Sequence, residues 1–151
     1  MSADSVRVEP AAEGDLAAIA EMEQDEEARR FITPATLDEH RVQMAMPQIA
    51  YLRILVNGAV SGFFILVLED DGDSVEFRRI VVSQRERGIG QRAISEMEQF
   101  CVQRLGRGRV WLDVFADNAR GQHVYEKLGY RQFRTGEARG RELLFYEKRI
   151  G

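Results

Sequence analysis

Several features are scarce in this sequence, and each shortage excludes a class of protein. The chain of 151 residues has one cysteine, so no disulfide can form within it. No apolar run approaches membrane-spanning length, and the first residues lack the character of a signal peptide. The net charge of -4 disfavours general nucleic-acid binding. We therefore expect a cytoplasmic protein with neither nucleic acid nor membrane as partner.

Metal-ligating clusters are also missing. His40 and His123 stand alone, so no metal is expected. Cys101 falls on the apolar face of a predicted helix, which favours a place in the core over a nucleophilic role. There is no internal repeat or linker, and the hydrophobic and charged fractions of 44% and 30% are those of a globular protein. The chain therefore predicts one domain over residues 1–151.

The most informative stretch changes from strand to helix at two glycines. Ser74–Val82 is rich in β-branched and aromatic residues, whereas apolar residues from Ile89 to Leu105 recur at helical spacing. A glycine turn into a helix leaves backbone N–H groups unpaired where the helix dipole favours negative charge. Positive charge is added by Arg85, Arg87 and Arg92. The stretch predicts a phosphate or pyrophosphate cradle, the alternative being a plain turn with a solvated face.

The rest of the chain predicts an α+β unit. Asn57-Gly58 is a hairpin signal, and Thr36 with Glu39 forms a capping box for a helix that carries His40 on its surface. Expected strands are 5–9, 51–56, 59–68, 110–115, 130–134 and 142–148; expected helices are 15–30, 36–46 and 119–128. The polar segment 135–141 joins the last two strands. The acidic first helix indicates a solvated face, although a field that attracts a cationic amine is the other interpretation.

A second stretch supplies the family resemblance. Arg85-x-x-Gly88-x-Gly90, followed by Asn118 and then by Val124-Tyr125-Glu126-x-Leu128-Gly129-Tyr130, resembles the GNAT superfamily of N-acetyltransferases. The order of elements fits from about Ser5 to Lys148. The strand Glu76–Val82 also resembles the branch that contains ribosomal-protein N-terminal acetyltransferases. Two departures are a segment after Val82 about two residues shorter than in many members, and Gly121 inside a helix.

The resemblance implies a fold and a cofactor. The fold is a mixed, mostly antiparallel sheet of about seven strands, flanked by about four helices and splayed between the fourth and fifth strands. The cofactor is acetyl-CoA as co-substrate. Residues implied in binding it are Ile80, Val81, Val82, Arg85, Arg87, Gly88, Ile89, Gly90, Gln91, Arg92, Asn118 and Tyr125.

The resemblance also implies catalytic roles. Acetyl transfer needs a neutral amine and a proton for the leaving thiolate, and the second role suits Tyr125. Glu76 and Asp113 are the candidate bases. Glu76 starts the splayed strand and is expected to face the acceptor channel, whereas Asp113 has the interval to Tyr125 of a glutamate in the ribosomal-protein enzymes. An ordinary ion pair with Arg78 or Arg79 is the alternative for each carboxylate.

Two other functions fit parts of the sequence. Gly88-Ile-Gly-Gln-Arg-Ala93 with Asp113 matches a loose dinucleotide-binding fingerprint, although a hairpin meander precedes it where a βαβ unit is required. A catalytically silent acyl-CoA sensor is the other alternative. In the family, the acceptor groove corresponds to about Asp25–Met46 and Phe133–Arg141. Its acidic residues leave open a polyamine, a protein N-terminus, a lysine or an aminoglycoside-like amine, and a homodimer is also open.

Overall fold

The computed structural model describes residues 4–29, 32–83 and 88–151, and its secondary structure follows the predicted order closely. Seven strands form one sheet in the order β1-β2-β3-β4-β5-β7-β6. The strands are β1 (Val6–Pro10), β2 (Ile49–Val56), β3 (Ala59–Leu68), β4 (Ser74–Val82), β5 (Arg109–Phe115), β6 (Arg131–Ala138) and β7 (Arg141–Arg149). The helices are η1 (Glu13–Asp15), α1 (Leu16–Met22), α2 (Glu26–Arg29), α3 (Leu37–Met44), α4 (Ile89–Gln103) and α5 (Ala119–Lys127).

The sheet is antiparallel except for the pair β4–β5. The predicted hairpin β2–β3 turns at Asn57-Gly58, where both residues have positive φ, 52° and 84°, as a type I′ turn requires. An antiparallel meander leads into β4 in place of a βαβ unit, so the fold excludes the dinucleotide-binding alternative. The predicted α+β fold with one mixed seven-stranded sheet is confirmed.

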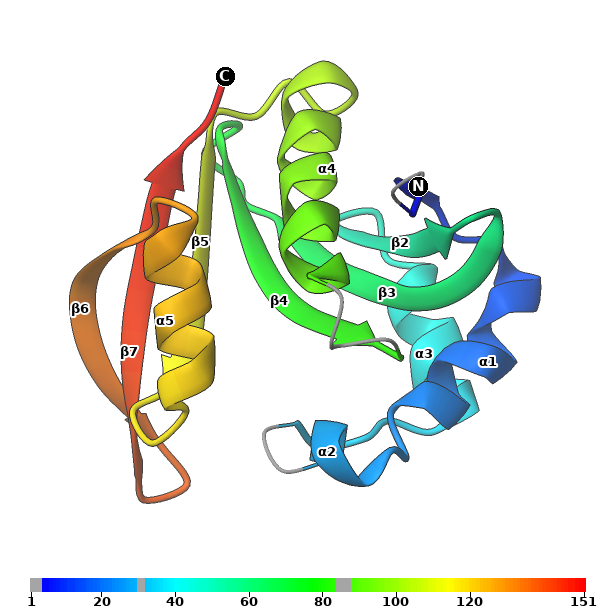
Figure 1. Cartoon of the computed structure of the whole chain (residues 1–151), viewed down its shortest axis with the longest axis horizontal. Helices are drawn as coiled ribbons and strands as arrows, with labels where there is room; N and C mark the ends of the chain where they lie inside the picture. Colours follow the sequence, from blue (N-terminus) through cyan, green and yellow to red (C-terminus); the bar gives the residue numbers. More distant parts are fainter. Residues whose placement is uncertain (1–3, 30–31, 84–87) are drawn as a thin grey trace.

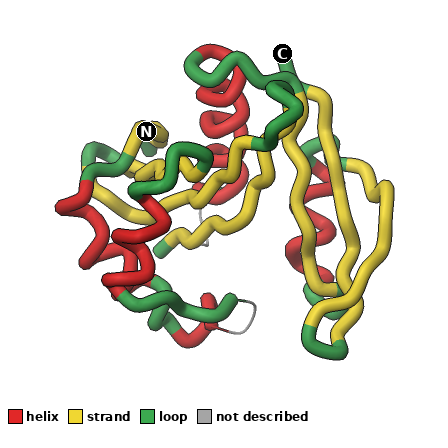
Figure 2. The backbone as a smooth tube through the Cα atoms, turned by 180° about the vertical axis from the view of Figure 1, so that it is seen from behind, coloured by secondary structure: helices red, strands yellow, loops and turns green. Residues whose placement is uncertain are grey.

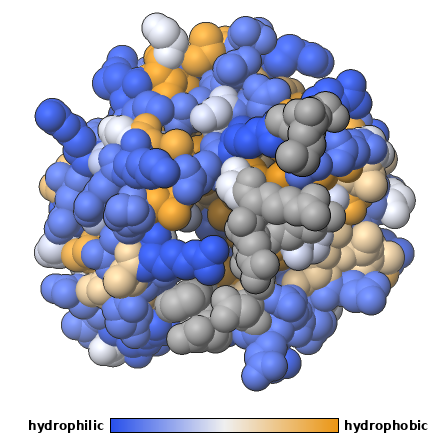
Figure 3. Space-filling view, in the orientation of Figure 1, coloured by the Kyte–Doolittle hydropathy of each residue, from blue (hydrophilic) through white to orange (hydrophobic). Residues whose placement is uncertain are grey.

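The helices cover both faces of the sheet (Figures 1 and 2). Alternate residues of a strand belong to opposite layers. Phe64 and Leu66 of β3 join the core under α4, whereas Phe63 and Ile65 join a second core beneath α1. Cys101 is buried in the α4 layer, where burial raises the pKa of its thiol to about 12, so it is a core residue. Hydrophilic side chains dominate the outer face shown in Figure 3.

Two predicted boundaries are wrong. The helix expected over 15–30 is divided into α1 and α2, because the chain turns at Glu23 and the Asp25 carboxylate accepts the Ala28 N–H in starting a new helix. The polar segment 135–141 is not a connection. It continues β6 to a two-residue turn at Arg139-Gly140, with φ of 55° and 74°. β6 is a largely exposed edge strand, so it shows no alternation of apolar and polar residues.

Candidate active site

The separation of β4 from β5 creates the main cavity found among the described residues. The two strands pair from Ser74–Arg109 to Glu76–Trp111 and then diverge, so from Phe77 onward this edge of β4 has no strand partner in the described chain. Figure 1 shows the strands meeting at one end and opening toward α2. A cavity of about 710 Å³ fills the opening. Its wall combines residues of α4 and α5 on one sheet face with residues of α2 on the other.

The N-terminus of α4 forms one part of the cavity wall. Gly88 has φ of 68° and precedes the first helical residue, and Gly88, Gly90 and Gln91 line the cavity. A Cβ added at Gly90 would meet nothing within 4 Å, so the helix end is open to a ligand. The N–H groups of the first turn have no intrahelical partner, which suits an anion. The sequence-predicted cradle therefore faces the cavity.

Two cofactor residues predicted near this turn, Ile89 and Arg92, are placed differently from the glycines. Ile89 is fully buried in the core and does not line the cavity. The Arg92 guanidinium donates to the carbonyl of Asp4 and does not line the cavity. Arg85 and Arg87 lie outside the described residues. Ile80, Val81 and Val82 all line the cavity beside the unpaired edge of β4.

Asn118 serves both as a helix cap and as part of the cavity wall. Its Oδ1 accepts the N–H of Gly121 at 2.9 Å at the start of α5, and both residues line the cavity. A Cβ at position 121 would lie only 2.8 Å from Nδ2 of Asn118. A side chain at position 121 would displace the Asn118 amide from its present place, so glycine leaves room for the cap as it stands.

Tyr125 extends from α5 into the cavity wall. Its ring makes edge contacts with Phe77 and Tyr130, at centroid distances of 5.9 and 6.1 Å. Its hydroxyl has no hydrogen-bond partner among the described residues, which leaves it available to a ligand. Burial, and then the charge of Asp113, raise the pKa of the phenol to about 12. Tyr125 is therefore protonated at neutral pH and can donate a proton into the cavity.

The two candidate bases lie close together on one sheet face, but their surroundings differ. Asp113 lines the cavity and has no hydrogen bond or ion pair within the described chain. Burial, and then the charge of Glu76, raise the pKa of Asp113, while Arg78 opposes this shift. The Glu76 carboxylate accepts from Nε and Nη2 of Arg78, at 3.3 and 3.0 Å, and is not part of the cavity wall. The structure thus leaves Asp113 open and Glu76 in an ion pair.

Beneath the α2 side of the cavity lies a buried polar network that the sequence did not reveal. Nε2 of His40 donates to Oε1 of Glu23 at 2.7 Å, and both side chains are fully buried. Nη1 of Arg79 donates to Oε2 of Glu23 at 2.5 Å, and the Ala35 N–H donates to Oε1 at 2.9 Å. The prediction that His40 is a surface residue is wrong, because the short helix α3 turns this side chain toward Glu23 and away from solvent.

The charge of this network is set by Glu23. Burial favours the neutral acid, but hydrogen bonds from His40 and Ala35 and the charge of Arg79 outweigh it, so the pKa of Glu23 is lowered. The hydroxyl of Tyr51 lies 2.7 Å from Nδ1 of His40. Burial raises the pKa of the Tyr51 phenol to about 12. The network therefore carries a carboxylate–guanidinium pair that fixes Arg79 at the cavity wall.

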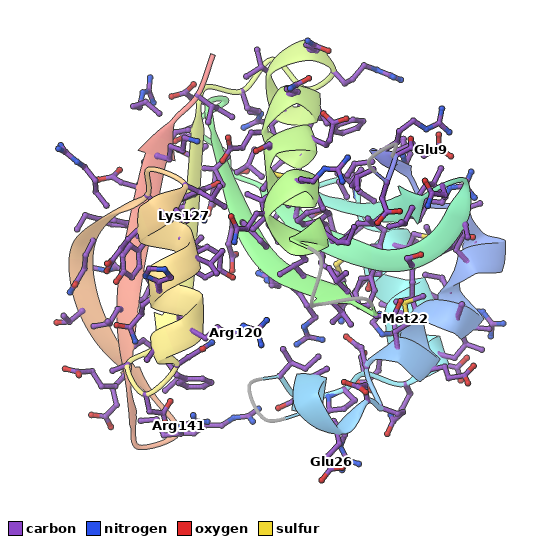
Figure 4. All side chains as sticks on the ribbon, in the orientation of Figure 1. Glu9, Met22, Glu26, Arg120, Lys127 and Arg141 are labelled. Atoms are coloured by element: carbon purple, nitrogen blue, oxygen red, sulfur yellow. The ribbon has the colours of Figure 1, made fainter. Side chains whose placement is uncertain are left out.

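Several arginines of the cavity wall were also missed by the sequence reasoning. Arg29, Thr33 and Arg139 come from the two ranges predicted to form the acceptor groove, and Nη1 of Arg139 donates to Oγ1 of Thr33 at 2.7 Å. Figure 4 labels Arg120 and Arg141 at the ends of α5 and β7 nearest to α2. Among the described side chains, no acidic residue of the first helices lines the cavity wall. The predicted acidic surface that would attract a cationic amine is therefore not part of this wall.

The cavity brings together several of the residues that the sequence resemblance implied for binding a CoA-type donor, namely Ile80–Val82, Gly88, Gly90, Gln91, Asn118 and Tyr125. Residues 16–130 match the model of the Acetyltransferase (GNAT) family. The chain therefore belongs to the GNAT family, and the predicted enzyme class, an N-acetyltransferase, is confirmed. No curated protein matches the sequence.

Solved structures of family members share the whole fold at low sequence identity. A putative phosphinothricin N-acetyltransferase has a TM-score of 0.80 at 17% identity, covering 97% of this chain and 99% of its own. The aminoglycoside acetyltransferase AAC(6')-Ib with coenzyme A scores 0.82 at 17% identity, with coverage of 96% and 95%. The spermidine N-acetyltransferase from Vibrio cholerae with CoA and spermine scores 0.82 at 15% identity, with the same coverage. No helix in the described ranges has the length and apolar character to cross a membrane.

The buried network predicts a strong effect of a neutral substitution at Glu23. Glu23→Gln should lower the free energy of unfolding by about 3 kcal/mol, because Arg79 loses its buried partner. Urea denaturation near neutral pH measures the loss. Glu9→Gln, which alters the more exposed ion pair with Arg53, is the matched control and should change stability far less.

The same substitution should change the pH dependence of stability. The folded pKa of Glu23 is lowered, so its contribution is fully present above the unfolded value of about 4.3. That contribution is lost as the pH falls through the folded pKa. The difference in stability between wild type and Glu23→Gln should therefore shrink in acid. A difference that stays constant down to the acid transition would show that ionisation of Glu23 does not stabilise the fold.

Proposed function

We propose that this protein transfers the acetyl group of acetyl-CoA to a primary amine by direct attack in a ternary complex. The observation that carries the proposal is the meeting of three features at one cavity. These are the open N-terminus of α4, the unpaired edge of β4, and the free polar groups of Tyr125 and Asp113. The first two suit a phosphorylated, amide-bearing donor, and the third suits proton transfer.

The chain offers matching groups along the length of such a donor. Backbone N–H groups from Gly88 to Gln91 can cradle the pyrophosphate, and the open space at Gly90 fits this role. The β4 edge beside Ile80–Val82 can pair with the amides of the pantetheine arm, while Asn118 faces the same space. The bound donor supplies the thioester that the amine attacks. Arg85 and Arg87 are proposed to add charge at the pyrophosphate, as the family resemblance implies.

The proton transfers follow from the placement of two residues. The amine nitrogen forms a bond to the thioester carbon, the carbon–sulfur bond breaks, and Tyr125 gives its proton to the departing thiolate. Asp113 accepts the proton released by the acceptor ammonium, directly or through one water. A backbone N–H of the unpaired β4 edge can stabilise the charge that develops on the carbonyl oxygen. Asp113 is the better candidate base because Glu76 is held by Arg78.

The acceptor of the proposed reaction is a small-molecule amine. Family members with this fold are named for phosphinothricin, aminoglycosides and spermidine, so the fold is compatible with several amine acceptors. A protein N-terminus, as in the ribosomal-protein branch, and a homodimer stay predictions from the sequence. A silent acyl-CoA sensor would bind the donor without releasing thiol, and a turnover assay with an amine panel separates the two functions.

A thermal-shift measurement tests the proposed pyrophosphate cradle at the N-terminus of α4. Acetyl-CoA should raise the melting temperature of the wild-type protein by mass action. Gly90→Asp should abolish that shift, because the substitution places bulk and negative charge at the N-terminus of α4. Gly14→Asp is the matched control, since it adds the same group at a position with nothing within 4 Å and outside the cavity wall. A full shift in folded Gly90→Asp would rule out the cradle.

A second prediction tests proton donation by Tyr125. Tyr125→Phe should lower kcat by about 100-fold or somewhat less, with little change in acetyl-CoA affinity, because the lost hydroxyl acts in the transition state. Tyr146→Phe removes a phenol hydroxyl that is bonded to Glu126 at 2.7 Å and lies outside the cavity wall, and it should leave kcat unchanged. A loss of affinity without a loss of kcat would make Tyr125 a packing residue.

The last prediction of this group separates the two carboxylates. Asp113→Asn should lower kcat/KM most near neutral pH, where free amine is scarce, and raising the pH should partly restore the rate. Glu76→Gln should cause a smaller loss without that pH-dependent recovery, because its charge acts through Arg78. Profiles of kcat/KM against pH for both variants give the answer. The opposite pattern would assign the base to Glu76, and full activity in both would leave proton removal to water.

A further inference from the structure

The cavity wall has a strong excess of positive charge. Among its described residues Asp113 is the only carboxylate. Six arginines share the same wall: Arg29, Arg78, Arg79, Arg120, Arg139 and Arg141. An enzyme that selects a polycationic amine would be expected to have the opposite balance, because like charges at close range oppose binding.

Three of these six cations are neutralised by carboxylates that lie outside the wall. The N···O distances are 3.0 Å for Arg78–Glu76, 2.5 Å for Arg79–Glu23 and 3.0 Å for Arg141–Asp117. Arg141 also lies over the ring of Phe115, 3.6 Å from its centroid. These three arginines are held in fixed positions by protein groups, and they contribute little uncompensated charge.

The remaining three arginines have no carboxylate partner among the described residues. These are Arg29, Arg120 and Arg139. The one hydrogen bond of the Arg139 side chain within the described ranges goes to the hydroxyl of Thr33, which holds the guanidinium without cancelling its charge. The left-handed backbone at Arg139 and the following Gly140 define a tight turn, so the base of this side chain is also fixed. The cavity therefore presents three available cations.

These three cations divide between the two sides of the cavity. Arg120 belongs to α5, on the sheet face that carries α4 and the proposed pyrophosphate cradle. Arg29 belongs to α2, and Arg139 donates to Thr33 just beyond α2. This segment lies on the opposite face, because its residues Ala28 and Ile32 pack against the core there. Asp113 points to that opposite face too, because its neighbours Leu112 and Val114 fill the α4 core. Arg120 thus suits the donor, whereas the other two suit the acceptor.

We propose that the acceptor amine also carries an oxyanion, such as a carboxylate or phosphonate, which Arg29 and Arg139 bind while the amine faces Asp113. The inference rests on the proposed acetyl transfer and specifies its substrate class. One carboxylate and two available guanidinium groups on the same side of the cavity match a zwitterion in sign. Guanidinium is well suited to oxyanions because its parallel N–H groups bind two oxygens at once.

The test compares acceptors that differ in one charge. Thiol release from acetyl-CoA is measured with free amino acids and aminoalkyl phosphonates. Each is paired with its uncharged amide or ester, and spermine and kanamycin represent polycations. We expect kcat/KM for the anionic member of at least one pair to exceed that of its neutral partner by about 100-fold, the effect of a good charge-assisted contact. Equal or reversed preference in every pair, or faster turnover of the polycations, would overturn the inference.

Variants locate the recognition. Arg29→Gln and Arg139→Gln should each raise KM for the preferred anionic acceptor about tenfold, and the double variant should lose the preference over the neutral partner. The KM for acetyl-CoA should be unchanged. Arg131→Gln is the matched control, because Arg131 is exposed on β6 outside the wall. A rise confined to the KM for acetyl-CoA would assign both arginines to the donor and overturn the inference.

Failure of this inference differs from failure of the proposed function. If only neutral or polycationic amines are acetylated, the substrate class is wrong and the acetyl transfer stands. If no anionic amine is acetylated, the inference is overturned, and the thermal shift with acetyl-CoA decides separately whether the donor site is correct. Loss of both the shift and all turnover would overturn the proposed function as well.

Discussion

The active-site geometry depends on the incomplete pairing of β4 with β5. Three residue pairs join the strands, and beyond Glu76 the sheet opens. Each side of the opening keeps its own support, because β4 stays paired with β3 and β5 stays paired with β7. Helix α4 covers the first group of strands and α5 the second (Figure 1). The sheet can therefore open without losing its hydrophobic core. An unpaired strand edge is normally a liability, but here it lies within a cavity where a ligand can use it.

Electrostatics give the two sides of the cavity different properties. Arg79 shows how the α2 side is fixed, since Glu23 holds its guanidinium and is itself held by His40. Burying such a network has a desolvation cost, so its benefit is better described as fixed geometry than as net stability. Similar pairs at Glu76 and Asp117 leave Asp113 as the uncommitted acid and leave Arg29 and Arg139 as available cations. A few ion pairs thereby define which charges a ligand meets.

Backbone features of a few residues position these groups. The left-handed Gly88 starts α4 at the mouth of the opening, and Gly121 leaves room for the Asn118 cap at the start of α5. The turn at Arg139-Gly140 brings the end of the β6–β7 hairpin to Thr33, which is 106 residues away in the chain. The α4–α5 side of the cavity is thus built from helix starts, and the α2 side from a hairpin turn and a short helix.

By itself the sequence determined most of the local structure and indicated the family. Strand and helix periods, the Asn57-Gly58 turn, the Thr36 cap and the glycine turn before α4 depend on neighbouring residues, so they can be predicted from them. The tertiary structure alone decided the burial of His40, the openness of Asp113 and the gathering of arginines from α2, α5 and the β6–β7 turn. These depend on contacts between residues far apart in the chain. A pattern of neighbouring residues carries no information about which distant partner will neutralise a given charge.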